Sequence, residues 1–105
     1  MSDSENAAPT LPEGLQAYRR TPIFDENSLP AALRRQHQTK AGVWGLIHVL
    51  EGRLRYRTFD PASETVLTPQ LQGVVHPQQF HEVEPLGPMR MFVEFHAVPE
   101  KTPGR

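Results

Sequence analysis

The 105-residue sequence predicts an all-β fold, a sandwich or barrel built from one domain. Turn-forming residues recur at short intervals, and short apolar or β-branched runs separate them. Only residues 31–36 keep a helical period, and that piece is too short for a helical core. The length leaves little room for a second core. We therefore expect one domain over residues 13–99, with flexible polar tails at 1–12 and 100–105.

Six turn signals divide the chain into the expected strands. They are rich in Pro, Gly, Asp, Asn and Ser, and they lie at residues 12–14, 25–28, 51–52, 60–63, 72–73 and 85–88. All five histidines fall between residues 37 and 96, inside these strands and their loops. His37 precedes the strand that holds Trp44, so its side chain is placed to reach over one end of the domain.

Glu51 and Gly52 predict a two-residue loop between strands at residues 44–50 and 53–59. Such a loop fixes the residues that face each other across a hairpin. On the apolar face, expected in the interior, the pairs are Val49 with Leu54, Ile47 with Tyr56, and Gly45 with Thr58. The second face places Trp44, Leu46, His48 and Leu50 opposite Phe59, Arg57, Arg55 and Arg53. Because this face mixes apolar side chains with arginines, we expect the N-terminal segment or a second subunit to cover it, and a homodimer is the resulting hypothesis.

The next strand begins at His81. The period of two directs His81 and Val83 inward and sends Glu82 and Glu84 to the other face.

Residues 89–96 form the most apolar strand, and it contains Glu94 and His96 on the same face. A carboxylate is costly to bury there without a cation or hydrogen-bond donors. Two interpretations follow: Glu94 has a functional role inside the domain, or Glu94 and His96 face water while Val93 and Phe95 face the core.

Composition excludes several classes of function. The sequence has no cysteine, so any metal must be held by His, Asp or Glu. A net charge of -1 argues against a general nucleic-acid binder. The longest apolar run, residues 43–50, is far shorter than the roughly 20 residues of a membrane-spanning helix. The N-terminus lacks the features of a secretory signal. We expect a cytoplasmic protein with no membrane or nucleic-acid partner.

Several other polar residues receive smaller roles. His48 is expected at the surface or in an interface, and His76 at a strand end with no role assigned. The arginines at 53, 55 and 57 are expected to be balanced by glutamates rather than to bind phosphate. Tyr56, directed inward, is expected to line a ligand cavity and offer its hydroxyl to a ligand.

Four runs, at residues 37–45, 49–52, 77–81 and 93–95, resemble the TehB/YeaR-like domain, a small cupin-type family. Residues 15–25 resemble the opening segment of that family, and the resemblance covers about residues 11–98. It implies a cupin-like double-stranded β-helix, or jelly-roll, barrel with a metal site at its mouth. In some bacteria this domain precedes a methyltransferase in tellurite-resistance proteins, but this sequence contains no such domain.

The resemblance also implies a set of ligands. His81 matches the histidine of the second cupin motif, and His37 is the only histidine of the first. Gly45 stands where the usual glutamate projects inward, so Glu94 is the expected substitute. His96 is expected as a fourth ligand or as a hydrogen-bond partner of a ligand. Such a set suits a divalent transition metal, zinc or Fe(II), with open coordination positions.

Three functions remain open. The first is a metal-binding cupin-type protein of bacterial stress response, to tellurite or a related oxyanion, whose metal binds a small molecule or anion. Whether it is an enzyme stays open; if it is, the metal acts as Lewis acid or oxygen activator, and Glu94 is a ligand or the general base. The second is a non-catalytic small-molecule binding or sensing module that acts through a dimer or partner. The third is a structural dimer without a metal site, which a solvent-facing Glu94 would favour.

Overall fold

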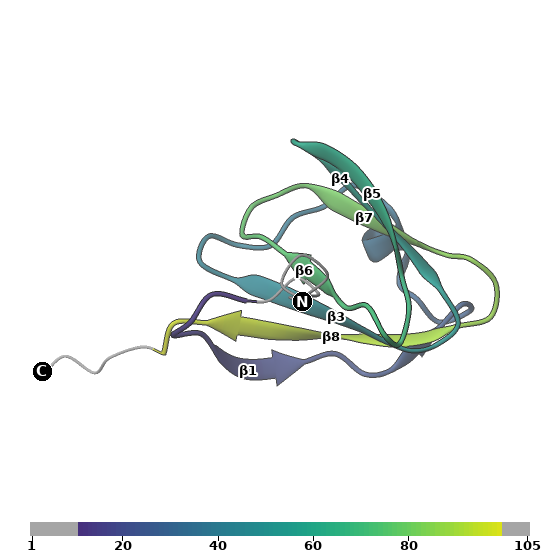
Figure 1. The fold of residues 1–105 in the computed structure, drawn as a ribbon, viewed down its shortest axis with the longest axis horizontal. Coiled ribbons are helices and arrows are strands. Elements are labelled where there is room, and N and C mark those ends of the chain that lie inside the picture. Colours follow the sequence, from purple (N-terminus) through teal and green to yellow (C-terminus); the bar gives the residue numbers. More distant parts are fainter. Residues whose placement is uncertain (1–10, 100–105) are drawn as a thin grey trace, which may run out of the picture.

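The computed structural model describes residues 11–99, and their architecture is almost entirely β (Figure 1). The strands are β1 (Gln16–Arg20), β2 (Phe24–Asp25), β3 (Trp44–Glu51), β4 (Leu54–Phe59), β5 (Ala62–Leu67), β6 (Gly73–Val75), β7 (His81–Pro85) and β8 (Arg90–Ala97). One short 3-10 helix, η2 (Ala31–Arg34), lies within the segment expected to keep a helical period. The all-β prediction is confirmed.

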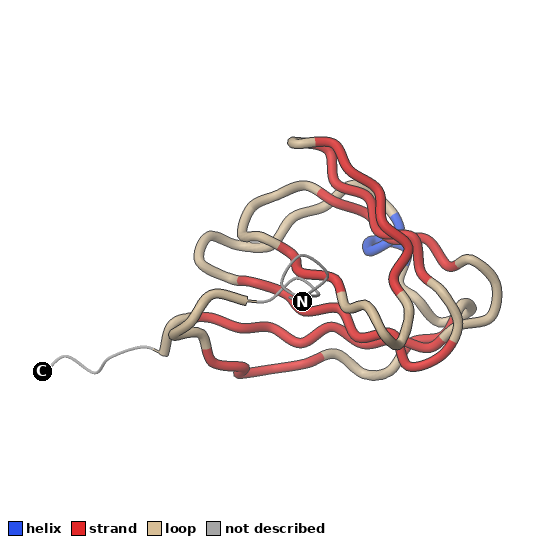
Figure 2. Tube along the Cα trace, viewed as in Figure 1, coloured by secondary structure: helices blue, strands red, loops and turns tan. Residues whose placement is uncertain are grey.

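The strands form two antiparallel sheets. The five-stranded sheet has the order β1-β8-β3-β6, with β2 also paired to β8, and the three-stranded sheet has the order β5-β4-β7. Figure 2 shows the two groups of strands facing each other, with the small helix at the end where they approach. The core therefore lies between the sheets.

The prediction of a hairpin between residues 44–50 and 53–59 is wrong. β3 pairs with β8 and β6, whereas β4 pairs with β5 and β7, so the two strands belong to different sheets. The turn at Gly52 packs tightly against the backbone of Pro88 and Met89, which leaves no room for a Cβ and directs the chain across the core. The predicted inward residues are nevertheless correct, because facing sheets bury the same alternate positions that a shared interior would.

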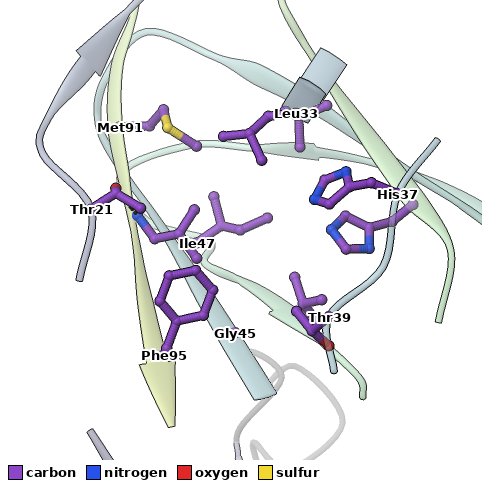
Figure 3. Close-up of a pocket in the computed structure, with 12 residues that line it drawn as sticks. Thr21, Leu33, His37, Thr39, Gly45, Ile47, Met91 and Phe95 are labelled. Atoms are coloured by element: carbon purple, nitrogen blue, oxygen red, sulfur yellow. Dashed lines mark hydrogen bonds between the residues drawn. The ribbon is translucent and has the colours of Figure 1, made fainter. Parts of the chain in front are cut away.

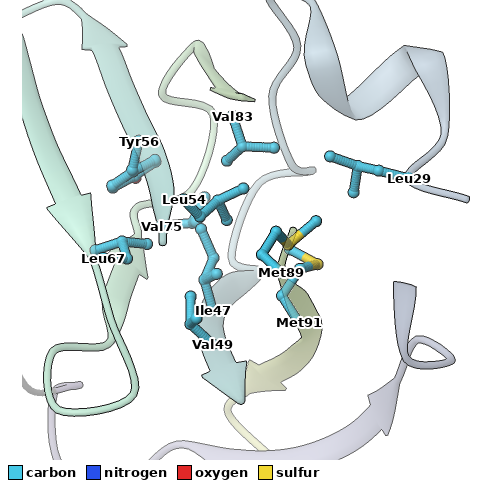
Figure 4. Packing of buried hydrophobic residues seen from close by; sticks show 10 residues of the cluster. All are labelled: Leu29, Ile47, Val49, Leu54, Tyr56, Leu67, Val75, Val83, Met89 and Met91. Atoms are coloured by element: carbon cyan, nitrogen blue, oxygen red, sulfur yellow. The ribbon is translucent and has the colours of Figure 1, made fainter. Parts of the chain in front are cut away.

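The core is formed by the inner faces of both sheets (Figure 4). Ile47, Val49 and Met91 come from the five-stranded sheet, and Leu54 and Tyr56 come from the three-stranded sheet. Leu54 and Met91 are completely buried. Close packing of this kind fixes the position of every inward-pointing residue on β3, β4, β7 and β8.

The arginines of β4 lie on the outer face of the three-stranded sheet. Arg55 Nη1 lies 2.8 Å from Glu84 Oε1, and Arg57 forms an ion pair with Glu82. Glu64 of β5 contacts both arginines. The expectation that glutamates balance the arginines is confirmed for Arg55 and Arg57, whereas within residues 11–99 no carboxylate forms an ion pair with Arg53.

The expected tails fall almost wholly outside the described residues. Residues 1–10 and 100–105 are not described, and Leu11 and Pro12 lie outside regular secondary structure. Within residues 11–99, no helix has the length and apolar character needed to span a bilayer.

Candidate functional site

A backbone bridge joins His37 to His81. The N–H of His37 donates to the carbonyl of His81 at 2.9 Å, and the N–H of His81 donates to the carbonyl of His37 at 2.8 Å. His37 follows η2, whereas His81 begins β7. Residues that exchange both backbone hydrogen bonds in an antiparallel pair direct their side chains to the same side. The imidazole rings accordingly lie with their centroids 4.1 Å apart.

Backbone carbonyls fix the orientation of both imidazoles. Nδ1 of His37 lies 3.2 Å from the carbonyl oxygen of Arg35, and Nδ1 of His81 lies 2.9 Å from that of Gln79. A carbonyl only accepts, so each Nδ1 carries a proton. Burial lowers the pKa of His81, and the nearby His37 lowers it further, although the Gln79 carbonyl acts in the opposite direction. His81 is therefore neutral at pH 7.

The two imidazoles border a small cavity between the sheets, with a volume of about 50 Å³ (Figure 3). His37 and Thr39 lie on one side of it, and Met91, Phe95 and Thr21 on the other. The remaining lining residues are Leu33, Gly45, Ile47, Val75, His81, Val83 and Val93. The walls are therefore mostly apolar.

The hydroxyls of this lining are already engaged. Thr21 donates to the carbonyl of Pro22 and accepts from the N–H of Val93. Thr39 donates to the carbonyl of Val43 and accepts from the N–H of Gln78. The imidazoles of the two histidines are thus the polar groups of the wall that remain for contact with a bound molecule.

Glu94 does not join His37 and His81, contrary to expectation. Val93 and Phe95 line the cavity, so strand alternation directs Glu94 to the outer face of the five-stranded sheet. The expected set of His37, His81 and Glu94 therefore does not converge. Across residues 11–99, no three or more His, Asp or Glu side chains are arranged to hold a metal.

On the outer face, Glu94 lies between two histidines. Its Oε1 atom is 3.3 Å from His48 Nε2 and 3.1 Å from His96 Nε2. Burial acts to raise the pKa of Glu94, but the hydrogen bonds from His96 and His48 outweigh it and hold the pKa below its usual range. His96 is therefore a partner of Glu94, not a fourth ligand beside His81.

His48 is held on its other side by Gln72 and stacked on Phe92. The Gln72 side-chain amide lies 2.9 Å from Nδ1, and the Phe92 ring centroid is 4.5 Å from that of the imidazole. The predicted position of His48 at the surface or in an interface is confirmed, whereas its pairing with Glu94 does not follow from the sequence pattern. The register was the missing information, since His48 lies opposite Phe92 and thus diagonal to Glu94.

Tyr56 points inward as expected, but its hydroxyl is engaged. It donates to the carbonyl of Val74 at 3.0 Å, and burial raises the pKa of Tyr56 to about 12. Tyr56 lines a different cavity, together with Thr58 and His76 among others. His76 directly follows β6, which confirms its expected place at a strand end.

Comparisons with known proteins identify proteins of similar fold and the family of this chain. The TehB-like domain model matches residues 19–93. The probable S-adenosyl-L-methionine-dependent methyltransferase TehB of Haemophilus influenzae is 34% identical over 77 residues, which cover 69% of this chain and 27% of that protein. This chain therefore spans about a quarter of that relative's length.

The similar solved structures include the following three. The crystal structure of Haemophilus influenzae TehB has a TM-score of 0.75 at 28% identity, over 82% of this chain and 32% of that one. A protein from Escherichia coli strain K12 has a TM-score of 0.81 at 20% identity, over 88% and 99%. Fe(II) HppE has a TM-score of 0.54 at 15% identity, over 87% and 57%.

At such identities the last two structures bear on the fold alone, and the cupin-like class is confirmed at the level of two facing antiparallel sheets. The family model, in contrast, spans most of the sequence, including His37 and His81. This chain belongs to the TehB-like domain family.

Proposed function

We propose that this domain binds a small molecule in the cavity bordered by His37 and His81. The observation that carries the proposal is the pair of imidazoles, each fixed through Nδ1 by a backbone carbonyl, on the wall of an otherwise apolar cavity. An apolar pocket with a few convergent polar atoms is the usual form of a small-molecule site. The two rings and the aliphatic wall then contact the ligand and limit the shape that fits.

The proposal predicts that filling the cavity abolishes binding. Val93→Phe places a larger side chain in the lining, and Val66→Phe is the matched control because Val66 is exposed on β5. We expect ligand-detected NMR to show 1-butanol binding to the wild type and to Val66→Phe but not to Val93→Phe. His37→Ala, which enlarges the cavity, should keep binding the alcohol. Equal binding by the wild type and a folded Val93→Phe variant would contradict the proposal.

A divalent transition metal, zinc or Fe(II), is the second candidate for the same two imidazoles. The supporting observation is the hydrogen bond from each Nδ1 to a carbonyl, because metal-binding histidines usually have their second nitrogen anchored in this way. The residues fit two coordination positions and not the three of a facial triad, since Glu94 lies on the opposite face of β8. Any further ligand would have to come from the bound molecule.

The metal content of untagged protein tests this second candidate. Near one equivalent of metal in the wild type and in Glu94→Ala, lost in His81→Ala, would favour it. Metal lost in Glu94→Ala, or absent from all three proteins, would oppose it. Methyl transfer is not proposed for this chain, which spans only 27% of the relative with that name. A stress-response role stays a prediction from the family resemblance.

The homodimer also stays a proposal. Its support is the outer face of the five-stranded sheet, where the apolar side chains of Trp44, Leu46 and Phe92 are half-buried. Leu46→Arg should convert a dimer into a monomer in analytical ultracentrifugation. A wild-type protein that sediments as a monomer at high concentration would contradict the proposal.

A further inference from the structure

The cavity beside His37 adjoins a second, wider hollow of about 290 Å³. The two share four lining residues, namely Leu33, His37, Thr39 and Phe95. The wider hollow adds residues of β1 and of the loop before β3, which are Tyr18, Arg19, Gln38, Lys40 and Val43. Because the two are adjacent, we infer that this hollow is the mouth of the inner cavity.

The mouth is positively charged. Arg19 and Lys40 line it, and no Asp or Glu is among the described residues that line the mouth or the inner cavity. Within residues 11–99, Arg55, Arg57 and Arg90 pair with glutamates, whereas no carboxylate lies within ion-pair distance of Arg19 or Lys40. Two cations without described counter-charges favour an anion at this position.

A ring positions one of these cations. The guanidinium carbon of Arg19 lies 5.5 Å from the centroid of the Phe95 ring, which lines both hollows. A cation over an aromatic face at this distance is attracted to the ring. This contact places the guanidinium at the passage from the mouth to the inner cavity.

The inner cavity differs from the mouth in chemistry. Its walls are mostly aliphatic, and its two imidazoles are each fixed through Nδ1 by a backbone carbonyl. Because one water needs about 10–15 Å³, a cavity of about 50 Å³ holds about three to five groups of that size. That space suits a short alkyl chain.

From this arrangement we propose that the ligand is a small amphipathic carboxylate. Its alkyl part enters the cavity beside His37 and His81, and its carboxylate stays at the mouth between Arg19 and Lys40. The inference rests on the proposed function, since it requires a ligand in that cavity, and it adds the ligand's charge and orientation.

Three probes separate the contribution of the alkyl chain from that of the charge. They are butanoate, 1-butanol with a similar chain and no charge, and inorganic phosphate with charge and no chain. We expect butanoate to bind more tightly than 1-butanol, and phosphate to cause no shift of the His81 ring signals in NMR, because His81 lines the inner cavity and not the mouth. Arg19→Gln with Lys40→Gln should weaken butanoate binding about tenfold and leave 1-butanol unchanged. Added salt should weaken butanoate only.

Arg53→Gln is the matched control, because it removes an exposed arginine that lines neither hollow. It should leave butanoate binding unchanged. Butanoate binding that is equal in the wild type and the double variant, or no tighter than that of 1-butanol, would overturn the inference while leaving a ligand site in place. If neither 1-butanol nor butanoate binds, the proposed function itself fails and the inference fails with it.

Discussion

His37 and His81 exchange two backbone hydrogen bonds, and their imidazole rings lie 4.1 Å apart on the wall of an apolar cavity. The two residues come from distant parts of the chain, a loop after η2 and the first position of β7. The two backbone hydrogen bonds fix the position of His37 relative to His81. Both rings are therefore held in place before any ligand arrives, which lowers the entropic cost of binding.

The buried His81 should make stability depend on pH. Its pKa is below the usual value of 6.5 in the folded state, so the unfolded chain binds more protons as pH falls. The free energy of unfolding should therefore decrease as pH drops below about 6.5. Urea denaturation at several pH values, compared between the wild type and His81→Gln, measures this effect. An identical slope in both proteins between pH 5 and about 6.5 would refute it.

The pairing of Glu94 with His48 and His96 should contribute modestly to stability and not to ligand binding. Glu94→Gln removes the charge from a partly exposed group, so we expect a loss of about 0.5–1 kcal/mol in the free energy of unfolding. Butanoate binding should not change, because Glu94 lies on the far side of the sheet. Glu51→Gln is the control, as its ion pair with Arg90 is largely exposed. A loss of ligand binding in Glu94→Gln would contradict the proposed site between the sheets, because it would indicate that the ligand binds on the outer face.

Leu54 should be among the most sensitive positions of the core. It is completely buried, so Leu54→Ala should cost about 3 kcal/mol through lost burial and the cavity left behind. The exposed Leu50 is the control, and Leu50→Ala should cost less than about 0.5 kcal/mol. Chemical denaturation measures the free energy of unfolding of both variants. Similar losses would contradict the burial of Leu54 in the core.

Gly52 should tolerate substitution worse than Gly87. Both have positive φ, 77° and 104°, but a Cβ at Gly52 would collide with the Pro88 carbonyl oxygen, and one at Gly87 would meet open space. Gly87→Ala should cost about 1 kcal/mol from the backbone conformation alone, whereas Gly52→Ala should cost about 3 kcal/mol because overpacking is added. Thermal unfolding distinguishes the two. Equal losses would mean that the turn does not pack against Pro88 as described.

The sequence was sufficient for the fold class but not for strand pairing. Turn spacing and the alternation in the strand of His81 and Val83 predicted β structure with the correct inward residues. The loop at Gly52 indicated a hairpin, yet its two strands lie in opposite sheets. A local pattern reports which side chains are buried. It does not report whether neighbouring strands pair edge to edge or face each other across a core.

The site was predictable only in part. His37 and His81 were identified through the family resemblance, and the structure brings them together. Glu94 was expected to join them, although the alternation of Val93 and Phe95 already indicated the opposite face. The cationic mouth was missed, because Arg19 and Lys40 lie on different segments and meet only through the packing of β1 beside the loop before β3.

The most direct test of the account is a titration with butanoate, followed through the imidazole Hε1 signals of the histidines by NMR. The account predicts saturable shifts of the His37 and His81 signals, with the His48 and His96 signals unmoved on the outer face. Shifts confined to His48 and His96, or no saturable shift of any histidine, would contradict it.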